Sequence, residues 1–517
     1  MPVKIQPGRL GLAQLRDIHY SQQPVEIDES ALPGIRASAA LVQKAALGGD
    51  AVYGVNTGFG KLANQRIAQT DLETLQLNLL RSHAVGVGEP MPERVVRLVL
   101  LLKAASLARG YSGIREVVIN LLLALYNHGL CPVIPCQGSV GASGDLAPLA
   151  HLCLPLIGEG EVFYQGQRLP AAEALAKAGL TPVKLSAKEG LALINGTQVS
   201  TALAIDALMA TERLFEAAVI SGAVTLDAAR GSDGPFDPRI HAVRGQPGQI
   251  DCAAAYRALT VGSQIRQSHL EGDDRVQDPY CLRCQPQVMG ACLDQMRYAS
   301  QVLVREANAV TDNPLVFADG DGAGTLLSGG NFHAEPVALA CDALAVVIAE
   351  IGAITERRIA MLVDTVASRL PAFLTPEPGL NSGFMIVHVT AAALASENKS
   401  LAHPASVDSL PTSANQEDHV SMATFAARRL QPMLRNTEYI VAIELLAAAQ
   451  GIEFLRPLKS STVLESVLQL VRQASPAMMQ DRSLAPDIER VHQLVAQGRV
   501  GLKGEEKITE LTALRLA

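Results

Sequence analysis

The sequence predicts a mainly α-helical protein built as a bundle of long helices. Of its 517 residues 48% are hydrophobic but only 4% aromatic, so Ala, Leu and Val must supply most of the core. These residues recur at helical spacing over long stretches, and Gly and Pro stand at the ends of those stretches. Strand signals are few, and residues 161–169 have the pattern of a short hairpin.

The predicted helices follow in chain order. Thr70 and Glu73 have the spacing of a capping box, which predicts a helix behind them. A second helix is expected to begin at Pro92 and end at Gly110. Further helical stretches are 114–128, 197–221, 287–306, 333–363, 385–401, 419–450 and 463–473. Several exceed the mean helix length of about 11 residues, which favours side-by-side packing.

The pattern of the sequence changes near residue 110, from Gly-rich loop segments to long stretches with helical spacing. We therefore expect an N-terminal loop-rich and helical domain at 1–110 and a long-helix bundle domain at 111–517. The most apolar stretch, 338–354, is interrupted by Asp342 and Glu350. This stretch is interpreted as a helix buried in protein and not as a membrane span.

Composition excludes several partners and locations. The net charge of −8 gives no general attraction for nucleic acid or an anionic membrane surface. No secretion signal is recognisable at the N-terminus, and eight scattered cysteines predict reduced thiols in the cytoplasm. Cys281 and Cys284 form a single C-x-x-C pair, and the 11 histidines include no HExxH motif. The sequence therefore predicts no metal site.

Residues 138–151 are the most informative segment. Taken alone, this run of small residues is typical of a flexible loop between helices, and Asp145 stands where an esterase motif around Ser143 would need glycine. The whole run resembles the signature of the aromatic amino acid ammonia-lyases. In that family an Ala-Ser-Gly tripeptide converts itself into a 4-methylideneimidazol-5-one electrophile, which implies the same for Ala142, Ser143 and Gly144.

The residue types suit this cyclisation. The nitrogen of Gly144 must reach the carbonyl carbon of Ala142, and a residue without Cβ lets the backbone bend sharply enough. Asp145 is suited either to proton transfer or to capping a helix, and both roles remain open. A helix that begins just after Gly144 would direct N–H groups at the ring and strengthen the electrophile.

The resemblance extends from about residue 8 to about residue 500 and implies further site residues. Tyr53 lies in a segment similar to the family's N-terminal loop, where the Tyr acts as an acid or base; by chemistry alone it could be a loop anchor. His83 would position the substrate, although a His at a helix C-terminus has a structural alternative. Asn195 would lie beside the prosthetic group and the substrate amine, or serve as a buried cap.

Five more residues complete the implied set: Gln277, Tyr280, Arg283, Phe332 and Glu417. Gln277 would contact the substrate, and Tyr280 would exchange a proton. Arg283 can bind a carboxylate through two parallel hydrogen bonds, with a structural ion pair as the alternative. Phe332 would place a ring in the pocket or pack in the core. Glu417 can accept a hydrogen bond from an imidazole N–H, which a phenyl ring lacks.

Together these features predict a carbon–nitrogen lyase that converts L-histidine to trans-urocanate and ammonia. Tyr53, Tyr280 or Glu417 would remove the β-proton, and the sequence leaves the choice open. The resemblance also implies a helical homotetramer with shared active sites and no metal or diffusible cofactor. The alternatives are a tyrosine or phenylalanine ammonia-lyase, an aminomutase of the same family, or a non-catalytic helical scaffold.

Overall fold

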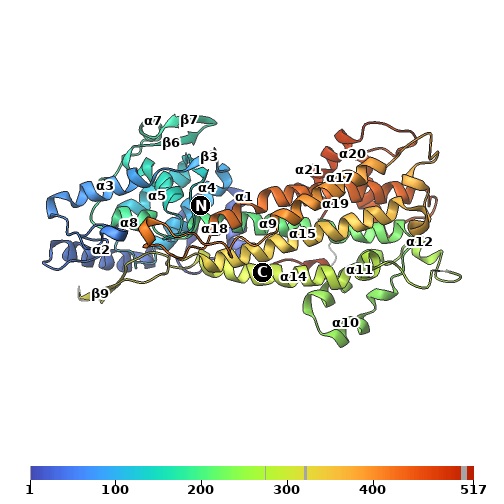
Figure 1. Ribbon diagram of the computed structural model, residues 1–517, viewed down its shortest axis with the longest axis horizontal. Helices are drawn as coiled ribbons and strands as arrows, with labels where there is room; N and C mark the ends of the chain where they lie inside the picture. The colour runs from blue at the N-terminus through green and yellow to red at the C-terminus, as the bar shows by residue number, and fades with distance from the viewer. Residues whose placement is uncertain (1, 274, 320–322, 502–508, 517) are drawn as a thin grey trace.

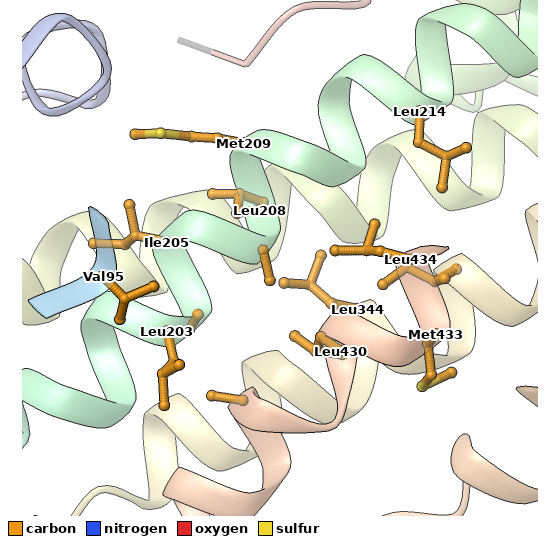
Figure 2. Packing of buried hydrophobic residues seen from close by; sticks show 14 of the residues in the cluster. Val95, Leu203, Ile205, Leu208, Met209, Leu214, Leu344, Leu430, Met433 and Leu434 are labelled. Atoms are coloured by element: carbon orange, nitrogen blue, oxygen red, sulfur yellow. The ribbon is translucent and has the colours of Figure 1, made fainter. Parts of the chain in front are cut away.

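A bundle of long helices forms the body of the computed structural model, which describes residues 2–273, 275–319, 323–501 and 509–516 (Figure 1). Its main helices are α9 (Gln198–Ala228), α14 (Gln285–Ala307), α15 (Glu335–Val363), α17 (Met385–Leu401) and α19 (Leu430–Glu453). They pack along one another, and Figure 2 shows Leu208 of α9, Leu344 of α15 and Leu430 of α19 meeting in the core. The predicted fold class is confirmed.

Shorter helices gather at one end of the bundle (Figure 1). They are α1 (Leu12–Ser21), α2 (Leu32–Leu47), α3 (Leu72–His83), α4 (Glu93–Leu107), α5 (Glu116–His128), α6 (Leu146–Cys153), α7 (Ala171–Ala178) and α8 (Glu189–Ile194). The remaining helices are α10 (Pro238–Arg244), α11 (Pro247–Thr260), α12 (Gln264–Gln267), α13 (Tyr280–Arg283), α16 (Thr365–Ser368), α18 (Ala423–Arg428), α20 (Thr462–Ala474), α21 (Ala485–Ala496) and α22 (Thr509–Thr512).

Strands are short and form small sheets. Parallel β1 (Val3–Ile5) and β2 (Val25–Ile27), and antiparallel β3 (Val87–Pro90) with β5 (Pro135–Gln137), make two pairs. β4 (Cys131–Pro132), β6 (Glu161–Tyr164) and β7 (Gln167–Pro170) form a three-stranded antiparallel sheet, and β8 (Leu315–Ala318) pairs with β9 (Gly324–Leu327). The predicted hairpin at 161–169 corresponds to β6 and β7.

Two local predictions were wrong. Thr70 does not cap α3, because it lies in a 3₁₀ turn, Gln69–Asp71, through which the chain enters the helix. The helix expected over 419–450 begins only at Ala423, because Met422 has a left-handed backbone with φ of 55°. The residues before Met422 form a loop instead, and this loop carries Glu417.

The helix α15 is the one described helix that is long and apolar enough to cross a membrane, and 67% of its most apolar window is buried inside the protein. Burial on this scale fits a core helix. A single apolar cluster also runs from Ile5 to Leu516, across residue 110. The division into domains at 1–110 and 111–517 therefore stays a prediction.

Candidate active site

Two cavities meet at Ser143. One has a volume of about 690 Å³ and is also lined by His83. The other has a volume of about 520 Å³ and is also lined by Ala142 and Phe332. The residues that line both cavities are Tyr53, Gly60, Ser143, Asn195 and Glu417. The structure thus brings together seven residues of the predicted site around one serine hydroxyl.

The backbone around Ser143 is held in an unusual conformation. Ser143 has φ of 53° and Gly144 has φ of 76°, in the left-handed region that side chains disfavour. A Cβ on Gly144 would lie 2.1 Å from the carbonyl oxygen of Gly196. The Asp145 N–H donates to that same oxygen at 2.8 Å. Glycine is therefore required at position 144 for both conformation and close packing.

Helix α6 begins at Leu146, just after this turn. As predicted, the N-terminal end of a helix follows Gly144 directly. The free N–H groups of its first turn and its positive dipole end favour negative charge on the neighbouring tripeptide. Ala142 is buried beside this end, and its small side chain leaves the approach to its carbonyl uncrowded.

Asp145 is fully buried and caps a helix, but this helix is not the one that follows it in the chain. It occupies the N-cap position of α6, yet its carboxylate makes no bond there. Instead it accepts hydrogen bonds from the Ser200 N–H at 2.8 Å and the Thr424 hydroxyl at 2.5 Å. Burial raises the pKa of Asp145, and these hydrogen bonds oppose the shift. Asp145 therefore caps the first turn of α9 and ties it to α18 and the Ser143 turn.

Glu417 is the carboxylate that faces Ser143. Its Oε1 accepts a hydrogen bond from the Ser143 hydroxyl at 3.3 Å. Its Oε2 accepts from the hydroxyls of Thr412 at 2.8 Å and Ser413 at 2.7 Å. These two local bonds fix the orientation of the carboxylate. One oxygen is therefore anchored by its own loop, while the other is available at the tripeptide.

His83 is the last residue of α3 and lines the larger cavity. Its Nδ1 lies 2.8 Å from the Leu79 carbonyl oxygen. A carbonyl can only accept, so Nδ1 carries the hydrogen and a neutral ring keeps its lone pair on Nε2. Burial lowers the pKa of His83, which favours this neutral form. His83 thus offers a hydrogen-bond acceptor to a bound molecule.

Tyr53 lies between the two cavities and is held by its loop. Its hydroxyl oxygen accepts a long hydrogen bond of 3.4 Å from the Gly60 N–H. Burial raises the pKa of Tyr53, and the negative charges of Glu417 and Asp312 add to this effect. The hydroxyl of Tyr53 thus has one hydrogen bond from its own loop and lies where both cavities can reach it.

Asn195 ends α8 and is almost completely buried. Its Oδ1 has no hydrogen-bond partner among the described residues, although an unsatisfied buried acceptor is costly. Its backbone carbonyl accepts a hydrogen bond of 2.7 Å from the buried ammonium of Lys103. Asn195 thus places an unpaired acceptor in the lining of both cavities, and Lys103 holds its backbone.

Gln277, Tyr280 and Arg283 lie at the opposite end of the bundle. Gln285, the first residue of α14, contacts the Gly222 carbonyl on α9 and the Arg358 side chain on α15. Because an α-helix rises 1.5 Å per residue, Gly222 lies roughly 35 Å from the start of α9 beside Ser143. The three residues therefore cannot reach the Ser143 of their own chain.

The far-end residues form a separate group. Gln277 and Arg283 line a cavity of about 490 Å³ that shares no residue with the two cavities at Ser143. The Tyr280 side chain is 71% exposed, and the Arg283 guanidinium lies 4.5 Å from the centre of its ring. Within the part of the chain that the structure describes, no carboxylate forms an ion pair with Arg283. The alternative role of this residue, a structural ion pair, therefore has no partner there.

Sequence reasoning missed Lys103 and the pair formed by Lys188 and Asp312. Both lysines are buried, and Lys188 Nζ lies 2.6 Å from Asp312 Oδ2. A signal existed for Lys103, since it stands alone in the apolar run 98–107. For Lys188 and Asp312 no local signal existed, because their contact joins residues far apart in the chain.

The chain is similar to known proteins over nearly its whole length. The family model described as aromatic amino acid lyase matches residues 10–473. A histidine ammonia-lyase of Rhodospirillum rubrum is 61% identical over 499 residues, which cover 96% of this chain and 96% of that protein. A histidine ammonia-lyase of Aromatoleum aromaticum is 60% identical over 496 residues, which cover 96% of this chain and 94% of that protein.

Solved structures show the same architecture. The crystal structure of histidine ammonia-lyase from Trypanosoma cruzi matches with a TM-score of 0.88 and 43% identity, covering 97% of this chain and 94% of that one. The structure of tyrosine aminomutase from Streptomyces globisporus matches with a TM-score of 0.90 and 34% identity, covering 97% of this chain and 98% of that one. One helical fold thus serves enzymes with different names.

Proposed function

The chain belongs to the aromatic amino acid lyase family, and we propose on this basis that it eliminates ammonia from L-histidine to give trans-urocanate. Relatives named histidine ammonia-lyase match it at 60% and 61% identity over nearly their whole length. The observation in this chain that carries the choice of substrate is Glu417. Its Oε1 lies 3.3 Å from the Ser143 hydroxyl, where it can accept a hydrogen bond from an imidazole N–H.

We further propose that Ala142, Ser143 and Gly144 form a methylideneimidazolone. Three observations support the fit: the left-handed backbone at Ser143 and Gly144, the lack of space for a Cβ on Gly144, and the helix α6 that begins beside them. When formed, this group supplies an electrophilic carbon, which no ordinary side chain offers. Asn195, with its unpartnered Oδ1, would lie next to it.

The residues around the tripeptide have matching tasks for histidine. Glu417 accepts from an imidazole N–H, and the lone pair on Nε2 of His83 can accept from the second N–H when the substrate ring is an imidazolium. Asn195 Oδ1 accepts from the substrate ammonium. The Tyr53 hydroxyl, which accepts from the Gly60 N–H, lies beside both cavities and can exchange a proton with a bound molecule. Removal of the β-proton is assigned to Tyr53, Tyr280 or Glu417.

Arg283 and Tyr280 are proposed to act in the site of another copy of the chain. Their distance from Ser143 in the same chain, roughly 35 Å along the helices, excludes an intramolecular role. A homotetramer with shared active sites, as the family resemblance implies, would bring the far end of one chain to the Ser143 end of the next. Arg283 would then bind the substrate carboxylate through paired hydrogen bonds, with Gln277 and Phe332 as further contacts.

The first experiment is a substrate test. Purified protein is incubated separately with L-histidine, L-tyrosine and L-phenylalanine, and the ultraviolet absorbance of the conjugated acrylate product is followed. Product from L-histidine alone is expected, and Ser143→Ala should abolish it. Product from an aryl substrate would favour the aryl ammonia-lyase alternative. Loss of the substrate without a conjugated product would favour an aminomutase, and no reaction with any of the three would favour a scaffold.

The second experiment tests the shared site. Ser143→Ala and Arg283→Ala are each expected to be inactive as pure assemblies. When the two chains are co-expressed, some sites combine an intact Ser143 with an intact Arg283, and activity should return in part. Co-expression of Ser143→Ala with Glu417→Ala serves as the matched control, because both changes lie at the same end of the chain. The shared site is contradicted if activity returns in this control but not in the mixture of Ser143→Ala with Arg283→Ala.

A cytoplasmic location is proposed as well. All eight cysteines lie in the described part of the chain and are free thiols. Burial raises the pKa of Cys131 and Cys153 to about 12, so these thiols are unreactive at neutral pH. Separation of cell fractions followed by the urocanate assay checks the location.

A further inference from the structure

Three potential metal ligands gather at the edge of the smaller cavity. His333 lies just before α15, Glu335 is the first residue of that helix, and His419 lies in the loop that carries Glu417. One ligand atom from each residue lies within 4.8 Å of the other two. Two imidazoles and one carboxylate are a donor set that divalent transition metals prefer.

The spacing of the two imidazoles fits a shared ion. His333 Nε2 lies 3.4 Å from His419 Nδ1, and the ring planes meet at 31°. Nitrogen ligands that each lie about 2.05 Å from a tetrahedral zinc ion are about 3.4 Å apart. His333 Nε2 also lies 3.3 Å from the His419 carbonyl oxygen, so an ion would replace this contact. With both nitrogens free of hydrogen, the two rings could then bind one ion with little movement of the backbone.

Glu335 supplies an independent observation. Its Oε2 is buried, and no hydrogen-bond partner exists for it among the described residues. A hydrogen bond between the two histidines would explain their closeness but would leave this oxygen unsatisfied. Burial of an unpartnered carboxylate oxygen is destabilising, and a bound cation would remove that cost.

We propose that His333, Glu335 and His419 form a binding site for one divalent transition-metal ion of the Zn²⁺ class. The ion joins the start of α15 to the loop that carries Glu417 and so restrains the position of this carboxylate. The site goes beyond the proposed elimination, since its ligands are distinct from Ala142, Ser143 and Gly144. It also departs from the sequence prediction of no metal, which rested on short motifs and on the family resemblance.

The ligand types predict a selectivity. Imidazole and carboxylate together suit Zn²⁺, Co²⁺ and Cu²⁺, whereas Mg²⁺ and Ca²⁺ prefer sites made of oxygen atoms. Affinity should therefore follow the order Cu²⁺ over Zn²⁺ over Co²⁺, and Mg²⁺ should not compete.

The experiment uses the full chain after removal of metal by a chelator. Co²⁺ is titrated while its visible absorbance is recorded, and Zn²⁺ is then added to displace it. One ion per chain is expected, and His419→Gln and Glu335→Gln should each weaken binding at least tenfold. The control His128→Gln, which removes an exposed histidine at the end of α5, should leave binding unchanged.

Two further variants separate this site from the catalytic tripeptide and from the cysteine thiols. Ser143→Ala should bind the ion as well as the unchanged protein, so the metal site can stand even if the proposed elimination fails. Cys281→Ser tests the C-x-x-C thiols as the ligands. The proposal is overturned if binding survives in both His419→Gln and Glu335→Gln, if Cys281→Ser abolishes it, or if the titration shows no binding.

Discussion

Replacement of Lys103 by Met should separate the stability of the protein from its activity. Lys103 lies on α4 with 1% of its surface exposed, and its ammonium donates to the Asn195 carbonyl at 2.7 Å. Burial lowers its pKa from 10.5 to about 8, although the charge of Asp312 opposes the shift. Burial of the charged ammonium is therefore destabilising, although the rest of the fold keeps it at the site.

The size of this effect follows from the pKa. A tenfold change in an equilibrium is worth about 1.4 kcal/mol, so the shift from 10.5 to about 8 corresponds to a cost of about 3 kcal/mol at neutral pH. Met has a similar length and no charge, so it removes that cost. It also leaves the Asn195 carbonyl without a donor, which costs roughly 1–3 kcal/mol. The variant should thus be as stable as the wild type at pH 7, or up to about 2 kcal/mol more stable.

The pH dependence has a definite sign. The folded chain has the lower pKa, so between pH 8 and 10.5 the unfolded chain binds more protons than the folded one. The free energy of unfolding of the wild type therefore increases as pH rises through this interval, because the destabilising charge of Lys103 is lost. The cost is present in full below pH 8. Lys103→Met lacks this gain, so any advantage of the variant should shrink as pH rises.

The assay is thermal unfolding of wild type and variant from pH 7 to 10, together with the urocanate assay at each pH. Lys459→Met is the matched control, because Lys459 is exposed and should show no such difference. Activity of Lys103→Met should fall, since the backbone of Asn195 loses its anchor. A variant that is much less stable at pH 7, or that keeps the pH dependence of the wild type, would refute the reasoning.

Other changes at the site have separate expected outcomes. Glu417→Gln keeps the size of the side chain but removes the charged acceptor, so kcat/KM for L-histidine should fall by a factor of roughly 10–100 with unchanged thermal unfolding. Gly144→Ala places a Cβ 2.1 Å from the Gly196 carbonyl oxygen; it should lose about 1–2 kcal/mol of stability or more and show no turnover. Asp145→Ala removes the acceptor for the Ser200 N–H and should cost about 2–4 kcal/mol in urea unfolding, with partial rescue in Asp145→Asn.

Helices could be predicted well because their signal is local. The run of apolar residues within 385–401 predicted a helix, and α17 has those same bounds. The start of α18, where the helix expected over 419–450 actually begins, could not be predicted in this way. Residues 419–422 have the composition of a helix, but the left-handed backbone at Met422 and its bond to the Val140 carbonyl depend on contacts with a distant segment.

The candidate site shows the same division between local and distant information. Ala142, Ser143 and Gly144 were recognisable because they are adjacent and belong to one signature. The capping of α9 by Asp145 and the support of Asn195 by Lys103 are not local, since each joins segments more than 50 residues apart. His333 and His419 are likewise separated by 86 residues, so no short motif could reveal their closeness.

The long helices explain why the predicted site is divided. A helix of 23 residues such as α14 is a rigid spacer, roughly 34 Å in length, with Arg283 before its first residue and Thr311 beyond its last. Thr311 contacts Gln198 at the Ser143 end, so α14 fixes the distance between the two groups of site residues. No small movement can bring the Arg283 group to the Ser143 group of the same chain. The helices α9 and α15 run alongside α14, so all three helices would have to become shorter. Any site that uses both groups must therefore be built between chains, and activity would depend on assembly.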